Sequence, residues 1–198
     1  LLTHLRSGDA AEQQREQVEL CPLLEEVART MANGHPVPSV DCQARGIHVS
    51  AHRERLAAVV GHVVRNAQDA TPPEGQVIVR LFKHNEMAVV EVQDTGAGMD
   101  EAFIRERLFR PFDTTKGQAG MGVGAHETRD FIRNLGGDVE VISRVGEGTS
   151  FRMRLPISEE SRNRIELETG PVNPDPIGTV APETAPIQAR GVQFGHSK

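Results

Sequence analysis

The hydrophobic pattern predicts helices in five parts of the chain. The strongest covers residues 53–70, where apolar side chains recur with a period near 3.6 until residues 71–73, Thr-Pro-Pro, stop the helix. Other helical patterns cover residues 1–19, 20–31, 100–108 and 124–135. The apolar face of the strongest helix consists of Leu56, Val59, Val60, Val63, Val64 and Ala67.

Short apolar or alternating stretches predict strands over residues 36–42, 47–50, 76–83, 88–94, 139–143 and 149–155. The third and fourth strands are joined by a short turn, as are the last two, so each pair is expected to form a β-hairpin. Because the helices are separated from a mixed, mostly antiparallel sheet, this order predicts an α+β fold. Its architecture would be a two-layer sandwich with the helices on one face.

The composition changes after residue 156. Prolines are scattered there through a polar, acidic stretch without hydrophobic periodicity, so residues 158–198 are predicted to be a disordered tail. We therefore expect one folded domain over residues 20–157. Residues 1–19 begin at once with helix-like spacing and are interpreted as the end of a longer helix.

Composition excludes several classes of protein. A net charge of −6 argues against general nucleic-acid binding, which leaves a basic footprint. No apolar run approaches the roughly 20 residues that span a bilayer, and no signal peptide is visible. We expect a cytoplasmic protein without membrane contact, although it could be a fragment of a membrane protein. The only cysteines, Cys21 and Cys42, are expected to be free thiols rather than a disulfide.

The strand over residues 88–94 ends in a candidate binding turn. Asp94 is followed by Thr-Gly-Ala-Gly, and Gly96 and Gly98 allow the backbone to approach a ligand closely. A carboxylate at the mouth of such a turn can accept a hydrogen bond from an exocyclic amine. Taken alone, an ordinary turn with an Asx-type hydrogen bond is the simpler interpretation.

Residues 114–124 form a second candidate, a glycine-rich loop that runs straight into a helix. Alternating glycines let successive backbone N–H groups converge on an anion, and the helix N-terminus adds a positive dipole end. Lys116 and the neighbouring threonines add a charge and hydroxyls. A flexible structural loop is an equally good interpretation of this stretch alone. Neither a P-loop nor a Rossmann motif is present.

Asn66 is the third candidate, since asparagine is a poor choice inside a helix on propensity grounds. Its amide oxygen suits Mg²⁺, which takes few protein ligands. Helical spacing places His62, Asn66 and Asp69 on one face. An ordinary solvated asparagine would look the same in isolation.

Together these segments resemble the catalytic ATP-binding domain of bacterial sensor histidine kinases, within the gyrase/Hsp90/histidine kinase/MutL superfamily (the Bergerat fold). The resemblance covers residues 20–156, and four motifs occur in the family's order. They are the N box at residues 62–71, the G1 box at 94–99, the F box at 108–112 with Thr-Thr-Lys after it, and the G2 box at 120–124. The sequence looks most similar to the nitrogen-regulation type of these kinases.

The resemblance implies a role for each matching residue. Asp94 would accept a hydrogen bond from the adenine of ATP or ADP, with Thr149 beside it, and Asn66 would hold Mg²⁺. His62, Asn66 and Lys116 are the residues implied in catalysis. The nucleotide-binding set implied by the motifs is Asn66, Asp94, Gly96, Gly98, Met99, Thr115, Lys116, Gly120, Met121, Gly122, Val123, Gly124 and Thr149.

Two departures from the family pattern bear on mechanism. His62 stands where these kinases usually have asparagine and where the hydrolases of the superfamily have a water-activating Glu, which disfavours hydrolysis. Ala125 replaces the usual Leu or Ser after the G2 glycines. The family's phosphoacceptor His lies on a dimerisation hairpin, of which residues 1–19 would be the end, so the chain alone is not expected to phosphorylate itself.

The resemblance therefore favours a kinase domain of a homodimeric parent, which phosphorylates a His on its own dimerisation domain and then a response regulator. A nucleotide-binding module without catalysis is the alternative, and an ATP hydrolase of the same superfamily is a third interpretation.

Overall fold

The computed structural model describes residues 15–110 and 124–162. Predictions for residues 1–14, 111–123 and 163–198 therefore lie outside the described part of the chain.

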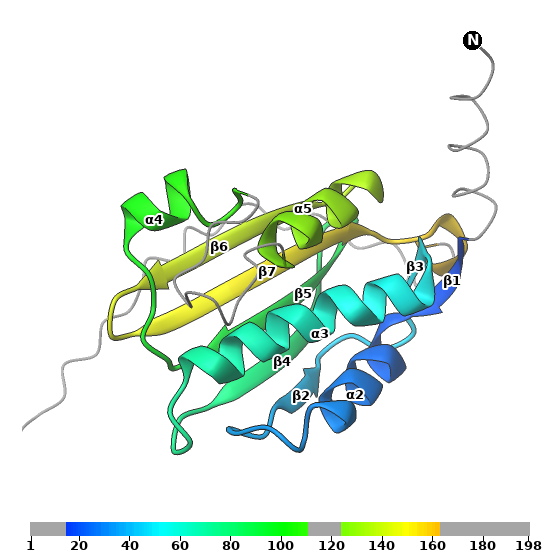
Figure 1. Ribbon diagram of the computed structural model, residues 1–198. Coiled ribbons are helices and arrows are strands. Elements are labelled where there is room, and N and C mark those ends of the chain that lie inside the picture. The colour runs from blue at the N-terminus through cyan, green and yellow to red at the C-terminus, as the bar shows by residue number, and fades with distance from the viewer. Residues whose placement is uncertain (1–14, 111–123, 163–198) are drawn as a thin grey trace, which may run out of the picture.

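A five-stranded sheet forms one layer of the molecule (Figure 1). Its strand order is β2-β4-β5-β7-β6, and only the β2–β4 pair is parallel. The predicted mixed, mostly antiparallel sheet is thereby confirmed. Its strands are β2 (Ser39–Cys42), β4 (Val77–His84), β5 (Met87–Asp94), β6 (Asp138–Arg144) and β7 (Gly148–Pro156).

Helices cover one face of this sheet and form the second layer (Figure 1). The long helix α3 (Arg53–Ala70) contacts β4 and β5, with α2 (Leu20–Thr30) and α5 (Gly124–Asn134) on either side of it. The short helix α4 (Glu101–Glu106) is capped by Asp100, whose Oδ1 accepts a 2.7 Å hydrogen bond from the backbone N–H of Phe103. This arrangement is the predicted two-layer α+β sandwich.

The core lies between the two layers. Every apolar position predicted for the long helix is at most 8% exposed, and alternate residues of β4, β5 and β7 face it. Burial of this face holds α3 against the centre of the sheet. The sheet residues in this layer are Val77, Val79, Leu81, Val90, Val92, Phe151, Met153 and Leu155.

The opposite face of the sheet carries a row of charges that alternate in sign. One residue from each strand stands in register, in the order Asp41, Arg80, Glu91, Arg152 and Glu140. Glu91, in the middle, is 6% exposed and receives hydrogen bonds from Arg152 at 2.8 Å and Arg80 at 3.1 Å. Burial alone would raise the pKa of Glu91, but hydrogen bonds from Ser150, Arg152 and Arg80 outweigh it and lower that pKa.

A second, two-stranded sheet corrects the last four residues of the helix predicted over residues 1–19. Glu16–Glu19 is strand β1, which pairs antiparallel with β3 (His48–Ala51). The prediction was wrong here because Val18 is the only apolar side chain of β1, and a single buried residue shows no period.

The prediction of two free thiols was also wrong, since Cys21 and Cys42 form a disulfide. Their Cα atoms lie 6.0 Å apart, joining the first turn of α2 to the end of the edge strand β2. Their separation of 21 positions in sequence gave no indication of this proximity.

The prediction of a disordered tail over residues 158–198 was wrong for residues 158–162. Residues 159–162 form a helical turn, and Ser161 is fully buried against the segment that leads into β3. Its Oγ donates to the Gly46 carbonyl at 2.9 Å and accepts from the backbone N–H of His48 at 3.0 Å. These bonds tie the residues after β7 to the smaller sheet.

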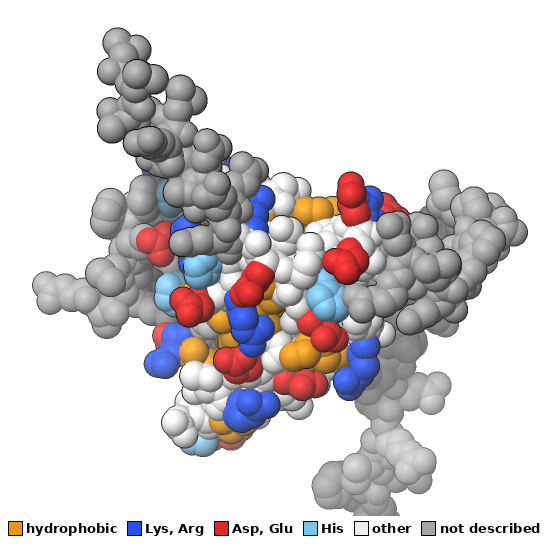
Figure 2. Space-filling model, turned by 90° about the vertical axis from the view of Figure 1, so that its right-hand side faces the viewer, with side chains coloured by type: hydrophobic (Ala, Val, Ile, Leu, Met, Phe, Trp, Pro, Cys, Tyr) orange, Lys and Arg blue, Asp and Glu red, His pale blue; other side chains and the backbone are white. Residues whose placement is uncertain are grey.

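Figure 2 shows one face of the molecule, on which acidic and basic side chains are interleaved with hydrophobic atoms. Across residues 15–110 and 124–162, no helix is long and apolar enough to cross a membrane.

Candidate functional site

Asp94 lies at the end of the central strand β5, on the face of the sheet that packs against the helices. It follows Val90 and Val92 at alternate positions and stands opposite Val77 of β4 and Thr149 of β7. Asp94 is only 5% exposed. The sequence therefore places a carboxylate where the strand pattern otherwise demands an apolar side chain.

The turn after β5 satisfies part of this carboxylate. The backbone N–H of Gly96 donates to Asp94 Oδ1 at 2.8 Å. Burial raises the pKa of Asp94, while hydrogen bonds from the backbone N–H groups of Gly96 and Thr149 favour the charged form and offset part of that rise. The Asx-type bond expected of an ordinary turn is thus present, but in a buried position.

The two glycines of this turn are required by close backbone approach. A Cβ on Gly96 would overlap the carbonyl of Ala70 at the end of α3, and one on Gly98, whose φ is +66°, would overlap the carbonyl of Arg144. Between them, the Ala97 N–H donates to the Ala70 carbonyl at 3.0 Å. The turn is therefore wedged between α3 and the β6–β7 hairpin.

Ser143, on β6, is a residue of this region that the sequence analysis missed. Its Oγ accepts a 2.8 Å hydrogen bond from the Met99 N–H and donates to the Gly148 carbonyl, also at 2.8 Å. It lies 2.9 Å from Thr149 Oγ1. Ser143 stands directly opposite Thr149 in the β6–β7 pair. Only the register of this hairpin identifies it as part of the region, and the sequence alone does not give that register.

The β6–β7 hairpin packs directly against the backbone of Asp94. A Cβ on Gly148, whose φ is +98°, would overlap the carbonyl oxygen of Asp94. Asp94, Gly96, Gly98, Met99 and Thr149, predicted from separate motifs, are thus brought together by β5, the turn and this hairpin.

The exposed face of α3 carries the second group of predicted residues. His62, Asn66 and Asp69 are all exposed on this helix, as their spacing predicted. The N-terminus of α5 lies beside His62, since a Cβ on Gly124 would be 4.0 Å from the Nδ1 of that side chain. A helix N-terminus, whose first backbone N–H groups have no partner within the helix, is therefore next to this face.

The connection between α4 and α5 contains the remaining predicted residues. Thr115, Lys116, Gly120, Met121, Gly122 and Val123 lie outside the described residues. The side of the connection that the structure describes is fixed by Phe109, which is half-buried against the core. The guanidinium of Arg129, on α5, stacks 4.4 Å from the centre of the Phe109 ring.

Residues 51–159, more than half of the chain, match the model of the histidine kinase-, DNA gyrase B- and HSP90-like ATPase family. The chain belongs to this family. The match begins in β3 and ends just after β7, so it contains both groups of predicted residues.

Histidine kinases are among the named relatives of this ATPase domain. Histidine protein kinase DivJ of Caulobacter vibrioides is 35% identical over 115 residues, which are 56% of this chain and 19% of DivJ. Signal transduction histidine-protein kinase AtoS of Escherichia coli is 28% identical over 118 residues, 59% of this chain and 19% of AtoS. The chain thus spans about a fifth of the length of these relatives.

Solved structures share the fold of the domain. The catalytic domain of histidine kinase ThkA is 26% identical, with a TM-score of 0.64 over 75% of this chain and 99% of the ThkA chain. Full-length ShkA in complex with AMPPNP has a TM-score of 0.64 over 73% of this chain and 31% of ShkA, at 22% identity. The chain therefore has the fold and homology of a histidine kinase catalytic domain.

Proposed function

We propose that this chain is the ATP-binding catalytic domain of a two-component sensor histidine kinase. It binds Mg²⁺-ATP and transfers the γ-phosphoryl group to a His on the dimerisation domain of its parent protein, from which the phosphate passes to an Asp of a response regulator. The observation that carries this proposal is the buried Asp94, held in a glycine turn of a domain homologous to histidine kinase catalytic domains.

The base of the nucleotide is assigned to the turn after β5. Asp94 Oδ1 already accepts the Gly96 N–H, and a carboxylate can accept several hydrogen bonds, so capacity remains for an adenine amine. Thr149 is held opposite Asp94 and close to Ser143. Gly96, Gly98 and Met99 shape the wall beside them.

The phosphates are assigned to the face of α3 and the N-terminus of α5. Gly124 opens α5 beside His62, and the positive end of that helix favours an anion. Lys116, Thr115, Gly120, Met121, Gly122 and Val123 complete this part of the site in the proposal, on the strength of their motifs alone. Phosphoryl transfer depends mainly on positioning and charge neutralisation, which such a set supplies.

The donor set of α3 fits a magnesium ion. The Asn66 amide oxygen is a hard ligand on an exposed face, which leaves room for the waters that Mg²⁺ keeps. When bound, the ion neutralises phosphate charge. His62, which could act as a weak base, is the other α3 residue assigned to catalysis.

The partners follow from the kinase assignment. ThkA has been solved in complex with response regulator protein TrrA, and this chain shares the ThkA fold with a TM-score of 0.61 in that complex. We infer a response regulator partner, a homodimeric parent and no nucleic acid or membrane contact by this domain. Residues 1–14 remain assigned to the end of the dimerisation helix; the nitrogen-regulation subtype rests on the motifs alone.

Calorimetry tests the proposal. The chain is titrated with ADP and with a non-hydrolysable ATP analogue, with and without Mg²⁺. We expect one site per chain and tighter binding when Mg²⁺ is present. No heat of binding in the presence of Mg²⁺ would refute the proposed function, whereas binding without any phosphotransfer to the parent's dimerisation domain would favour the non-catalytic module.

A further inference from the structure

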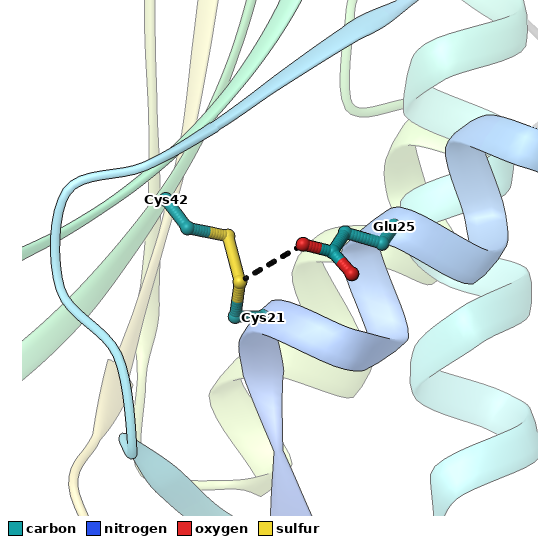
Figure 3. A group of neighbouring side chains, drawn as sticks. All are labelled: Cys21, Glu25 and Cys42. Atoms are coloured by element: carbon teal, nitrogen blue, oxygen red, sulfur yellow. Dashed lines mark hydrogen bonds between the residues drawn. A yellow bond between two sulfur atoms is a disulfide. The ribbon is translucent and has the colours of Figure 1, made fainter.

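Across the described residues, one group of three potential metal ligands lies within reach of a single ion. It consists of Cys21, Glu25 and Cys42, whose ligand atoms all lie within 4.8 Å of one another (Figure 3). We propose that, when the disulfide is reduced, this group binds one zinc ion. The proposal does not depend on nucleotide binding.

The geometry of the group suits a tetrahedral ion. Cys21 and Glu25 are four residues apart on α2, so both side chains lie on one face of its first turns, and Cys21 Sγ is 3.6 Å from Glu25 Oε1. Sulfur and oxygen ligands at typical zinc distances, about 2.3 and 2.1 Å, are about 3.6 Å apart on a tetrahedral ion. This pair already has that separation.

Cys42 reaches the same position from the edge strand β2. The Cα atoms of the two cysteines are 6.0 Å apart, and two thiolates on one zinc ion have sulfurs about 3.8 Å apart. Small side-chain rotations supply this separation once the sulfur–sulfur bond is broken. Glu25 is exposed, so water can take the fourth position.

The chemistry of the donors selects the metal. Two thiolates favour a thiophilic ion such as Zn²⁺ over Mg²⁺ or Ca²⁺, which prefer oxygen ligands. Cys21 is the second residue of the 11-residue helix α2, whose positive dipole end favours a thiolate. The carboxylate of Glu25 completes a ligand set of three negative charges around one dication.

Zinc binding and the disulfide exclude each other. A phosphine reductant breaks the sulfur–sulfur bond, giving two thiols and a phosphine oxide whose oxygen comes from water. Zinc then replaces the two thiol protons, which are released to solvent. The ion links α2 to β2 at the point where the disulfide does, so a reduced chain regains this connection only with metal.

Cobalt absorption tests the site on the full chain. The chain is reduced with a phosphine, freed of reductant under argon and titrated with Co²⁺, then with Zn²⁺ against a chromophoric indicator. We expect one Co²⁺ per chain with thiolate charge-transfer and tetrahedral d–d bands, displaced by Zn²⁺, and no such bands for the oxidised chain. Because Cys21 and Cys42 are the only cysteines, the thiolate bands report this pair and not the histidines.

Variants assign the ligands. C21S and C42S are expected to lose the charge-transfer band, whereas E25Q keeps it and binds zinc at least about tenfold more weakly. E26Q, which removes the neighbouring carboxylate that pairs with Arg53, is the matched control and should keep its affinity. E25Q retains both cysteines, so it tests the site even if a serine variant fails to fold.

Two results would overturn the proposal. One is a reduced chain, folded by circular dichroism, that shows no thiolate–cobalt band. The other is an E25Q chain with unchanged zinc affinity, which would remove Glu25 from the ligand set and leave only a thiol pair.

Discussion

Two acidic residues of the same strand illustrate how a single side chain is tuned by its surroundings. Asp94 and Glu91 are both at most 6% exposed. Glu91 is surrounded by Arg80, Arg152 and Ser150, and its pKa is lowered, whereas Asp94 has only backbone N–H donors among residues 15–110 and 124–162, and its pKa is raised by burial. A buried acid with no cationic partner among its hydrogen-bond donors is poised for a ligand, and one between two arginines is structural.

Replacing Asp94 with Asn should weaken adenine nucleotides by about 10- to 100-fold, because a charged hydrogen-bond acceptor contributes roughly 1.5–3 kcal/mol. Lys116→Ala, placed at the phosphate end, is expected to cost clearly less. Calorimetric titration with ADP and Mg²⁺ measures both. Equal losses would show that Asp94 does not contact the base.

Glu91→Gln should destabilise the domain at neutral pH by about 1–3 kcal/mol, since it removes the buried charge that accepts hydrogen bonds from the half-buried Arg80 and Arg152. Because the folded-state pKa of Glu91 lies below the usual 4.5, its contribution to stability is present above pH 4.5 and is lost as pH falls through the folded-state pKa. The difference in free energy of unfolding between the parent chain and the variant should therefore shrink on acidification.

Urea denaturation at several pH values between 7 and 3 measures this difference. Glu74→Gln, in the exposed turn before β4, is the control and should stay within about 0.5 kcal/mol of the parent chain throughout. A Glu91→Gln deficit that is constant down to pH 3 would contradict the linkage.

At the scale of elements, the turn after β5 packs so closely against neighbouring backbone that there is no room for a side chain at Gly98. Gly98→Ala adds a Cβ that overlaps the Arg144 carbonyl, so we expect a loss of about 1–3 kcal/mol in the free energy of unfolding beyond the cost of the positive φ. Gly46→Ala is the matched control, because Gly46 has a similar φ of +70° but nothing within 4 Å of the added Cβ.

Thermal unfolding of both variants separates the two effects. The Gly98 variant should also bind ADP more weakly, since the displaced turn carries Asp94 at its start. Equal unfolding midpoints for the two variants would mean that the turn moves aside without cost.

Elements with a strong period were predictable from the sequence, and elements formed by long-range pairing were not. The pattern predicted α3 over Arg53–Ala70 because its six apolar positions all face the core. Strand β1 was missed because its pairing with β3 depends on register rather than on its own composition. The buried Ser161 was missed for the same reason, since its hydrogen-bond partners are more than 100 residues away in sequence.

The residues of the candidate site also fall into a predictable and an unpredictable group. Asp94, Gly96 and Gly98 were predicted because one short motif contains the acid and the glycines that need close approach. Ser143 could not be predicted, because only the pairing of β6 with β7 brings it to Thr149 and Met99. The spacing of Cys21 and Cys42 likewise contains nothing about the distance between α2 and β2 in space.

At the scale of the whole molecule, the proposed reaction needs a phosphoacceptor segment in addition to this domain. The chain spans about a fifth of the length of DivJ and AtoS. Phosphotransfer is therefore expected only when the phosphoacceptor segment of the parent protein is supplied. Mixing the two should restore His phosphorylation in trans, measured with radiolabelled ATP. Asn66→Asp should abolish it, because an added charge replaces the proposed metal ligand's neutral amide; full activity would remove Asn66 from the metal site.

The contact between Gly148 and the carbonyl of Asp94 has a consequence for synthesis of the protein. Until β7 has emerged from the ribosome, β5 is an edge strand that can pair only with β4, and its terminal acid has no Thr149 opposite it. A nascent chain that ends before residue 148 therefore holds every motif from the N box to the G2 box and still lacks one wall of the proposed base site. If the proposed base site is correct, nucleotide stabilises only a chain whose last hairpin is complete, and the four motifs alone do not suffice.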